Sequence, residues 1–297
     1  MRKIVKREEF QMKFTKVTSS VLAGATLLSI LAPTASFAAS NGKDNGGTAL
    51  PMTDTTDAAI SFGDNHDNGN TGYLRLQMVP KTLDFGNHAK YDAKHSNFDA
   101  TGANLGVIGN NTHASFSQQD SNQTETLTTN DANLKAVNGT AWATVVDKQI
   151  DNPALVNNTD PQNPTKGTSG DWALTVSADG TGLVAGSHKI TGASLVFANT
   201  KSARTGNIYG LTNADDDKNY TDAATTAADV TTPNSVSLDL STANQEKAVA
   251  TAAKNQGDGA NVFGWNPTDI RLALNGSNDV VTGEYHTALT WTLNATA

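Results

Sequence analysis

The chain has 297 residues, a formal net charge of −8 and no cysteine. The absence of cysteine excludes disulfide bonds, thiol catalysis and zinc sites built on cysteine. An acidic chain is also a poor partner for nucleic acid, whose phosphates attract Lys and Arg. Only 37% of the residues are hydrophobic, while Asn, Asp, Thr, Ala and Gly are abundant. We therefore expect a narrow core and long polar loops.

Residues 1–38 have the three parts of a secretory signal peptide. Six basic and two acidic side chains lie within residues 1–16, an apolar run follows at residues 21–31, and small residues surround Ala38. The apolar run is too short for a membrane span, which needs about 20 residues. An anchoring N-terminal helix is the alternative. We expect cleavage after Ala38, leaving a secreted mature chain without a membrane span and with a net charge of about −12.

The segment after the cleavage site is polar. Residues 39–70 are rich in Asn, Gly, Asp and Thr, which predicts a flexible polar linker. The first strand is predicted directly after this segment, where Leu74, Leu76 and Met78 alternate with polar residues. The folded domain is therefore expected to cover residues 71–297.

Within this domain, long polar inserts are predicted near residues 87–140 and 199–234. Outside them, short runs alternate between apolar and polar residues. These predicted strands are residues 141–147, 172–177, 195–197, 236–240, 270–274 and 285–293. Residues 245–254 are rich in Ala and fit either a helix or a strand, of which the strand is favoured.

Period-two alternation in several short runs is typical of antiparallel sheets that are covered on one side. Two such sheets packed face to face give the fold class that we expect, an all-β, antiparallel β-sandwich with long polar loops. Whether the chain forms one sandwich or two stays open at this point.

Two Trp-x-Leu elements lie in the clearest of these strands, Trp172 with Leu174 and Trp291 with Leu293. In a strand this spacing places both side chains on one face, about 7 Å apart. Core packing is the favoured interpretation, because both elements alternate cleanly and a buried Trp removes roughly 200 Å² from water. The alternative is that these four residues form a binding site, with the rings exposed as a platform for glycan.

These two elements, in this order, resemble the WxL domain of Gram-positive surface proteins. Further matches are residues 83–86 (LDFG) after the first strand and residues 191–197 (TGASLVF) after the first Trp. The resemblance covers roughly residues 71–297. One departure is at residues 147–149, where members often carry Asp-Asn-Arg and this chain has Asp-Lys-Gln.

The resemblance implies non-covalent binding to the cell wall, through peptidoglycan as the ligand. It also implies WxL-interacting surface proteins as partners and a location at the cell surface. The sequence is consistent with this, since it contains neither a sortase-type Leu-Pro-x-Thr-Gly motif nor a C-terminal hydrophobic anchor.

No pattern for catalysis stands out. The six histidines are scattered without a metal-ligand spacing, and no pair of carboxylates has the arrangement that glycan hydrolysis needs. The acidic clusters at residues 64–69 and 215–217 invite a calcium interpretation, but solvated loops are favoured. We therefore expect a non-catalytic protein with no metal site and no cofactor.

Three functions follow as hypotheses. The leading one is a wall-binding module. The alternative is an adhesin or surface-complex subunit that binds a partner protein or a host surface through the two inserts, since such long loops are uncommon without a role. A wall-active hydrolase is the third.

Overall fold

The computed structural model describes residues 50, 52–57, 70–89, 91–107, 111–153, 167–220, 230–274 and 280–295. All of them belong to the compact unit that spans residues 40–297. The predicted signal peptide and its cleavage position lie outside the described residues. Within the described part, no helix has the length and apolar character to cross a membrane.

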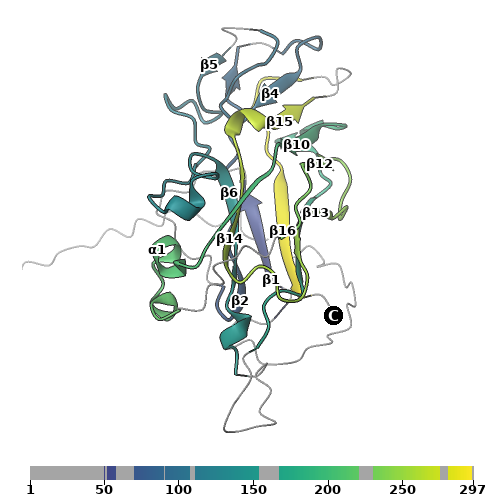
Figure 1. Cartoon of the computed structure of the whole chain (residues 1–297). Coiled ribbons are helices and arrows are strands. Elements are labelled where there is room, and N and C mark those ends of the chain that lie inside the picture. Colours follow the sequence, from purple (N-terminus) through teal and green to yellow (C-terminus); the bar gives the residue numbers. More distant parts are fainter. Residues whose placement is uncertain are drawn as a thin grey trace, which may run out of the picture. The chain divides into compact units, whose positions relative to one another are not determined.

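Most of the strands form three four-stranded antiparallel sheets (Figure 1). The first sheet has the order β1 (Met52–Asp57), β16 (Ala288–Ala295), β7 (Trp172–Ala178), β13 (Lys247–Ala252). The second has the order β11 (Lys201–Thr205), β14 (Gly259–Trp265), β6 (Ala141–Asp147), β2 (Leu74–Met78). The third has the order β12 (Ser235–Asp239), β10 (Ser194–Ala198), β15 (Ile270–Ala273), β4 (Asn97–Asp99). Two small hairpin-like sheets pair β3 (Asn87–His88) with β5 (Asn111–His113) and β8 (Leu183–Ala185) with β9 (His188–Ile190).

The second and third sheets are continuous with each other. β10 leads into β11 through Asn199, whose φ is 54°, and β14 leads into β15 through the 3-10 turn η4 (Pro267–Asp269). Because β10 pairs with β15 and β11 pairs with β14, these segments form one bent ribbon. Buried side chains of the first sheet share one core with those of the bent layer. The fold is a two-layer antiparallel β-sandwich, which confirms the predicted fold class.

Burial shows how each sheet is covered. Along β7 and β16, buried positions alternate with partly exposed ones, as expected for a sheet covered on one side. In contrast, β6 and β14 are buried at every position. Their outer face packs Trp142 and Val146 under residues 127–137 and the short helix α1 (Ile208–Thr212). The prediction of one-sided covering is therefore wrong for the second sheet.

Two segments predicted as loops contain strands of the sandwich. Met52–Asp57 lies in the predicted linker at residues 39–70, yet it forms β1 and pairs along its whole length with β16. The linker prediction is wrong for these residues, because the strand is held by backbone pairing along β16 and Met52 enters the core. Likewise, Lys201–Thr205 in the predicted insert 199–234 forms the edge strand β11.

The predicted insert at residues 87–140 also contains short ordered elements. They are β3, β4, β5 and the 3-10 turn η1 (Ala132–Leu134). The favoured strand at residues 245–254 is confirmed by β13. No strand was predicted at Gly259–Trp265, because these residues contain two glycines and do not alternate, although β14 is central in the second sheet.

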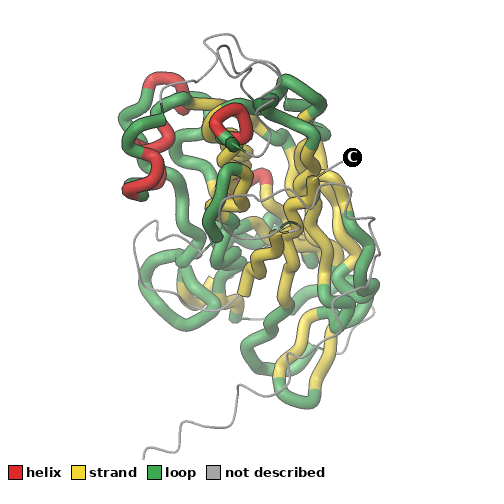
Figure 2. Tube along the Cα trace, turned by 90° about the horizontal axis from the view of Figure 1, so that it is seen from below, coloured by secondary structure: helices red, strands yellow, loops and turns green. Residues whose placement is uncertain are grey.

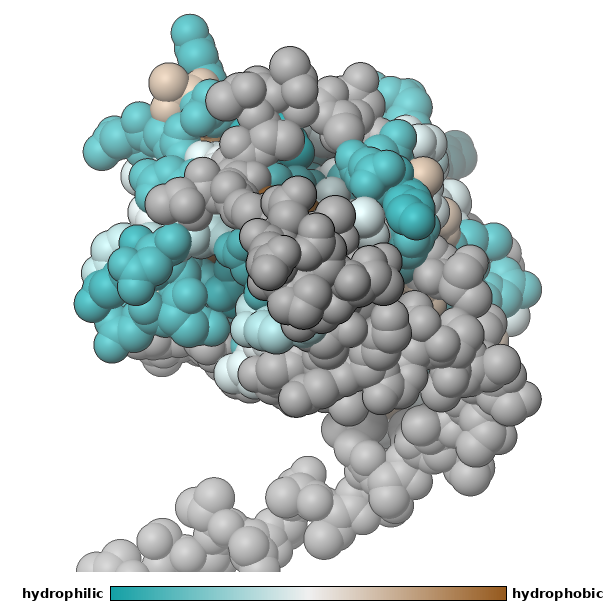
Figure 3. Space-filling view, turned by 60° about the horizontal axis from the view of Figure 1, so that its bottom comes forward, coloured by the Kyte–Doolittle hydropathy of each residue, from teal (hydrophilic) through white to brown (hydrophobic). Residues whose placement is uncertain are grey.

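In the part of the chain that the structure describes, helical structure is confined to short turns (Figure 2). Besides α1, η1 and η4, these are η2 (Gln149–Asp151) and η3 (Asp215–Asp217). The described residues on the face shown in Figure 3 are mostly hydrophilic, which agrees with the polar composition of the chain.

Candidate functional site

The four residues of the Trp-x-Leu elements lie inside the sandwich. Trp172, Leu174, Trp291 and Leu293 each have a relative exposure of 0%. Their strands, β7 and β16, are neighbours in the first sheet, with Leu174 opposite Leu293 and Val176 opposite Trp291. In this conformation none of the four side chains can touch a wall polymer, and all four contribute to the core.

The two Trp rings are part of a larger group of aromatic rings that joins the three sheets. Trp291 lies 6.0 Å from Trp265 of β14 and 5.9 Å from Phe197 of β10, measured between ring centroids. Trp172 lies 6.4 Å from Phe263 of β14. Aromatic pairs at such distances contribute about 0.5–1.5 kcal/mol beyond their burial. The strand of Phe197 was predicted from the sequence, whereas β14, which carries Phe263 and Trp265, was not.

Trp172 is also held by a buried carboxylate. Its indole Nε1 donates to Asp147 Oδ2 at 3.0 Å, and the backbone N–H groups of Gly170 and Gln149 donate to the same carboxylate at 2.7 and 3.0 Å. Burial raises the pKa of Asp147 to about 7, although these hydrogen bonds oppose the increase. Asp147 therefore links the end of β6 to the start of β7.

A second buried carboxylate lies in the acidic cluster at residues 215–217. Asp217 accepts hydrogen bonds from Arg75 at 2.5 Å, Lys148 at 2.6 Å and Thr212 at 2.5 Å. Burial raises its pKa, but these hydrogen bonds outweigh that effect, so that the pKa is lowered overall. The solvated-loop prediction is thus wrong for Asp217, whose oxygens face two cationic side chains rather than calcium. The other acidic cluster, residues 64–69, lies outside the described residues.

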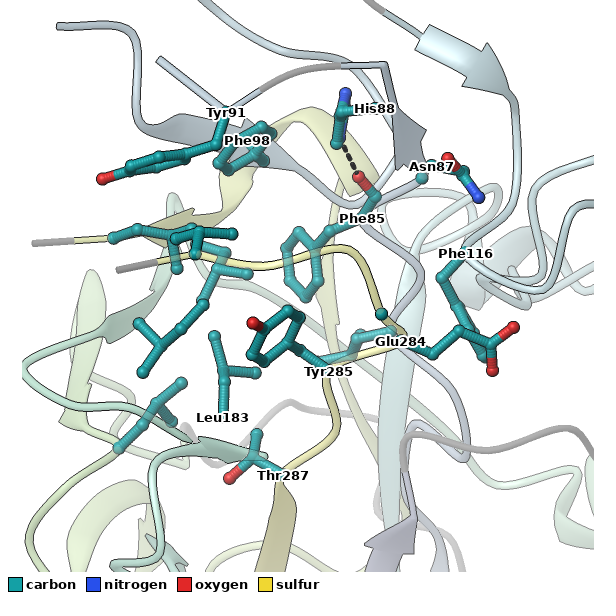
Figure 4. Close-up of a pocket in the computed structure, with 18 of the residues that line it drawn as sticks. Phe85, Asn87, His88, Tyr91, Phe98, Phe116, Leu183, Glu284, Tyr285 and Thr287 are labelled. Atoms are coloured by element: carbon teal, nitrogen blue, oxygen red, sulfur yellow. Dashed lines mark hydrogen bonds between the residues drawn. The ribbon is translucent and has the colours of Figure 1, made fainter. Parts of the chain in front are cut away.

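A cavity of about 460 Å³ opens on the inner side of the third sheet (Figure 4). Its floor consists of buried leucines of the third sheet and of β8 and β16, namely Leu183, Leu195, Leu272 and Leu289. Its sides carry six aromatic rings, namely Phe85, His88, Tyr91, Phe98, Phe116 and Tyr285. A pocket of this size and composition is typical of a site for an organic ligand.

Residues 83–86 (LDFG) shape one side of this cavity. Asp84 is fully buried, and its carboxylate accepts hydrogen bonds from the backbone N–H of Gly86, Phe116 and Gln123 at 2.9–3.0 Å. Gly86 has a φ of 80°, and a Cβ there would lie 2.5 Å from the carbonyl oxygen of Gly102. The sequence singled out residues 83–86 only through the family resemblance, and the structure shows that Asp84 holds the loop that carries Phe116.

Two histidines lie near the cavity. The Nε2–H of His88 donates to the carbonyl oxygen of Phe85 at 2.7 Å, and the imidazole packs 4.5 Å from the ring of Phe98. Burial lowers the pKa of His88 below 6.5. His286 is half exposed and lies 3.7 Å from Glu284. Among the described residues, no three His, Asp or Glu side chains are grouped as a metal site would require.

A family model described as "WxL domain surface cell wall-binding" matches residues 43–296 of the chain. The chain belongs to this family. Neither a curated protein nor a solved structure matches it. The match includes β1, which lies ahead of the predicted start of the domain at residue 71.

The description of the WxL family also states a function. The WxL domain is a binding module of the cell wall, and it places the protein at the cell surface. No catalytic family was found in the chain. The motif that gives the WxL domain its name is buried here.

Proposed function

We propose that this WxL domain holds the exported protein on the wall of a Gram-positive bacterium non-covalently, without catalysis, and that peptidoglycan is the polymer bound. The observation that carries the proposal is the family match over residues 43–296. The net charge of −8 supports an uncharged or weakly charged wall polymer over teichoic acid, because both the chain and teichoic acid are anionic.

We also propose that Trp172, Leu174, Trp291 and Leu293 act on wall binding only through the stability of the sandwich. Their complete burial supports this role, since a side chain without exposed area makes no contact with a polymer. Conservative replacement is then expected to leave the affinity of the folded protein unchanged.

Co-sedimentation of the purified mature protein tests the proposal. The protein is mixed with isolated walls, with walls stripped of teichoic acid, and with purified peptidoglycan. We expect similar binding to all three and no release of soluble muropeptides. Loss of binding after removal of teichoic acid would contradict peptidoglycan as the ligand, and muropeptide release would contradict a non-catalytic role.

The Trp172→Phe variant separates the two roles of the motif. We expect it to melt at a lower temperature and to bind walls like the parent protein while it is folded. A folded variant with the parent's melting temperature and a weaker affinity would instead place the indole in the binding surface.

A second candidate is a surface-complex subunit that binds WxL-interacting proteins or a host surface. It is supported by residues 127–137 and 208–217, which pack on the outer face of the second sheet and so offer an ordered surface. Asp215 and Asp216 are exposed there, with side-chain exposures of 89% and 58%. Replacing both with Arg should weaken association with a partner protein while wall binding persists, as measured by crosslinking on cells.

A further inference from the structure

The cavity beside the third sheet is built as a permanent feature rather than a gap between mobile loops. Its floor side chains belong to strands β8, β10, β15 and β16, and they are less than 10% exposed. One side is fixed by the carboxylate of Asp84, which accepts hydrogen bonds from the backbone N–H groups of Gly86 and Phe116. These bonds hold the segment that carries Phe85 next to the loop that carries Phe116. A site whose walls are already in place loses little entropy when a ligand enters.

The chemistry of the cavity is apolar and nearly free of charge. Among the described residues that line it, there is no Lys or Arg, and Glu284 is the one carboxylate. Glu284 lies at the rim with a side-chain exposure of 50%. An anionic group inside would have no cationic partner, and the burial of an unpaired charge is strongly unfavourable.

The hydroxyl of Thr287 does not change this apolar character. Thr287 lines the cavity, but its Oγ1 is buried and has no exposed surface toward it. A ligand inside therefore meets mainly the carbon atoms of this residue. Figure 4 shows Thr287 on the same side of the cavity as Leu183, with Phe85 and Tyr285 facing it.

We propose that this cavity is a binding site for a small, uncharged and largely apolar ligand that has an aliphatic or aromatic body. The body would lie on the leucine floor against the rings of Phe85 and Tyr285. This site is separate from the Trp-x-Leu core and does not depend on which wall polymer the protein binds.

Fluorescence of the neutral probe N-phenyl-1-naphthylamine with the mature protein tests the site. We expect saturable enhancement at one site per chain. Three competitors with the same ten-carbon chain then report the preferred head group: 1-decanol, decanoate and decylamine at pH 7. We expect 1-decanol to displace the probe at a concentration at least about tenfold lower than decanoate requires. Equal displacement by decanoate, or no saturable enhancement, would overturn the proposal.

Matched variants locate the site. Leu274 lines the cavity and is partly exposed, whereas Leu105 is 48% exposed and does not line it. Leu274→Trp should fill the opening and abolish probe binding, while Leu105→Trp should leave it unchanged. Thermal unfolding of both variants checks that they are folded. Equal binding by the two folded variants would show that the probe binds outside the cavity.

Discussion

The two ends of the same sandwich are filled in different ways. Where the first sheet meets the second, Trp172, Trp291, Phe263 and Trp265 are all at most 1% exposed and fill the space between the layers. Where the first sheet meets the third, smaller leucines cover the floor and a cavity of about 460 Å³ remains. The comparison teaches that the family's name-giving residues belong to the filled end, which secures the fold. The hollow end leaves space beside the core that a ligand could occupy.

The largest effect is expected at the centre of the filled end. Trp291→Ala should destabilise the protein by about 3–5 kcal/mol, because it removes a fully buried ring that contacts both Trp265 and Phe197. Urea unfolding measures the change. Tyr285→Ala, at the cavity, is the matched control and should cost far less. Equal costs would break the distinction between the two ends.

The edge of the filled end should respond to pH through Asp147. Its folded pKa of about 7 lies above the ordinary aspartate value of 3.8, so the folded state keeps a proton that the unfolded state releases. Stability should therefore fall as pH rises from about 4 to 7, by at most about 4 kcal/mol from this group. Asp147→Asn should remove this part of the slope.

Urea unfolding of both proteins between pH 4 and pH 8 provides the measurement. The slope is compared rather than the absolute stability, because the amide also alters the hydrogen bonds of Trp172 and Gly170. Parallel pH profiles for the two proteins would show that Asp147 has a similar pKa in the folded and unfolded states.

The outer covering of the second sheet should show a smaller effect. Arg75→Met removes one of the two cations that pair with Asp217, while Lys148 and Thr212 still donate to it. We expect a loss of about 2–3 kcal/mol, the range for a hydrogen bond between charged groups. Asp215→Asn is the control, since Asp215 is 89% exposed and pairs only with Lys218 at the surface. A similar loss in both variants would show that burial does not matter here.

The filled end could be predicted in large part from the sequence, and the hollow end could not. Alternation along β7 and β16 places Trp172 and Trp291 on inward faces, because period-two patterning directly encodes which side is buried. Their partners Phe263 and Trp265 were missed, since β14 is covered on both faces and has no alternation to detect. Periodicity reports a strand only when its two faces differ.

The cavity depends on residues far apart in the chain. Phe85, Phe98, Phe116 and Tyr285 come from four separate segments, and no local pattern indicates that they meet. Residues 83–86 stood out in the sequence only through the family resemblance, which says nothing of a cavity. Similarly, β1 was missed because a strand held by backbone pairing needs few apolar side chains.

The smallest effect should come from the wall of the cavity itself. Leu274→Ala removes a partly buried side chain next to existing empty space, so it creates little new void and should cost less than about 1 kcal/mol. The same variant enlarges the opening, which should change the affinity for N-phenyl-1-naphthylamine more than it changes the stability. Urea unfolding and probe titration on one preparation measure both quantities. A loss of stability as large as that of Trp291→Ala would mean that the hollow end supports the fold as strongly as the filled end does.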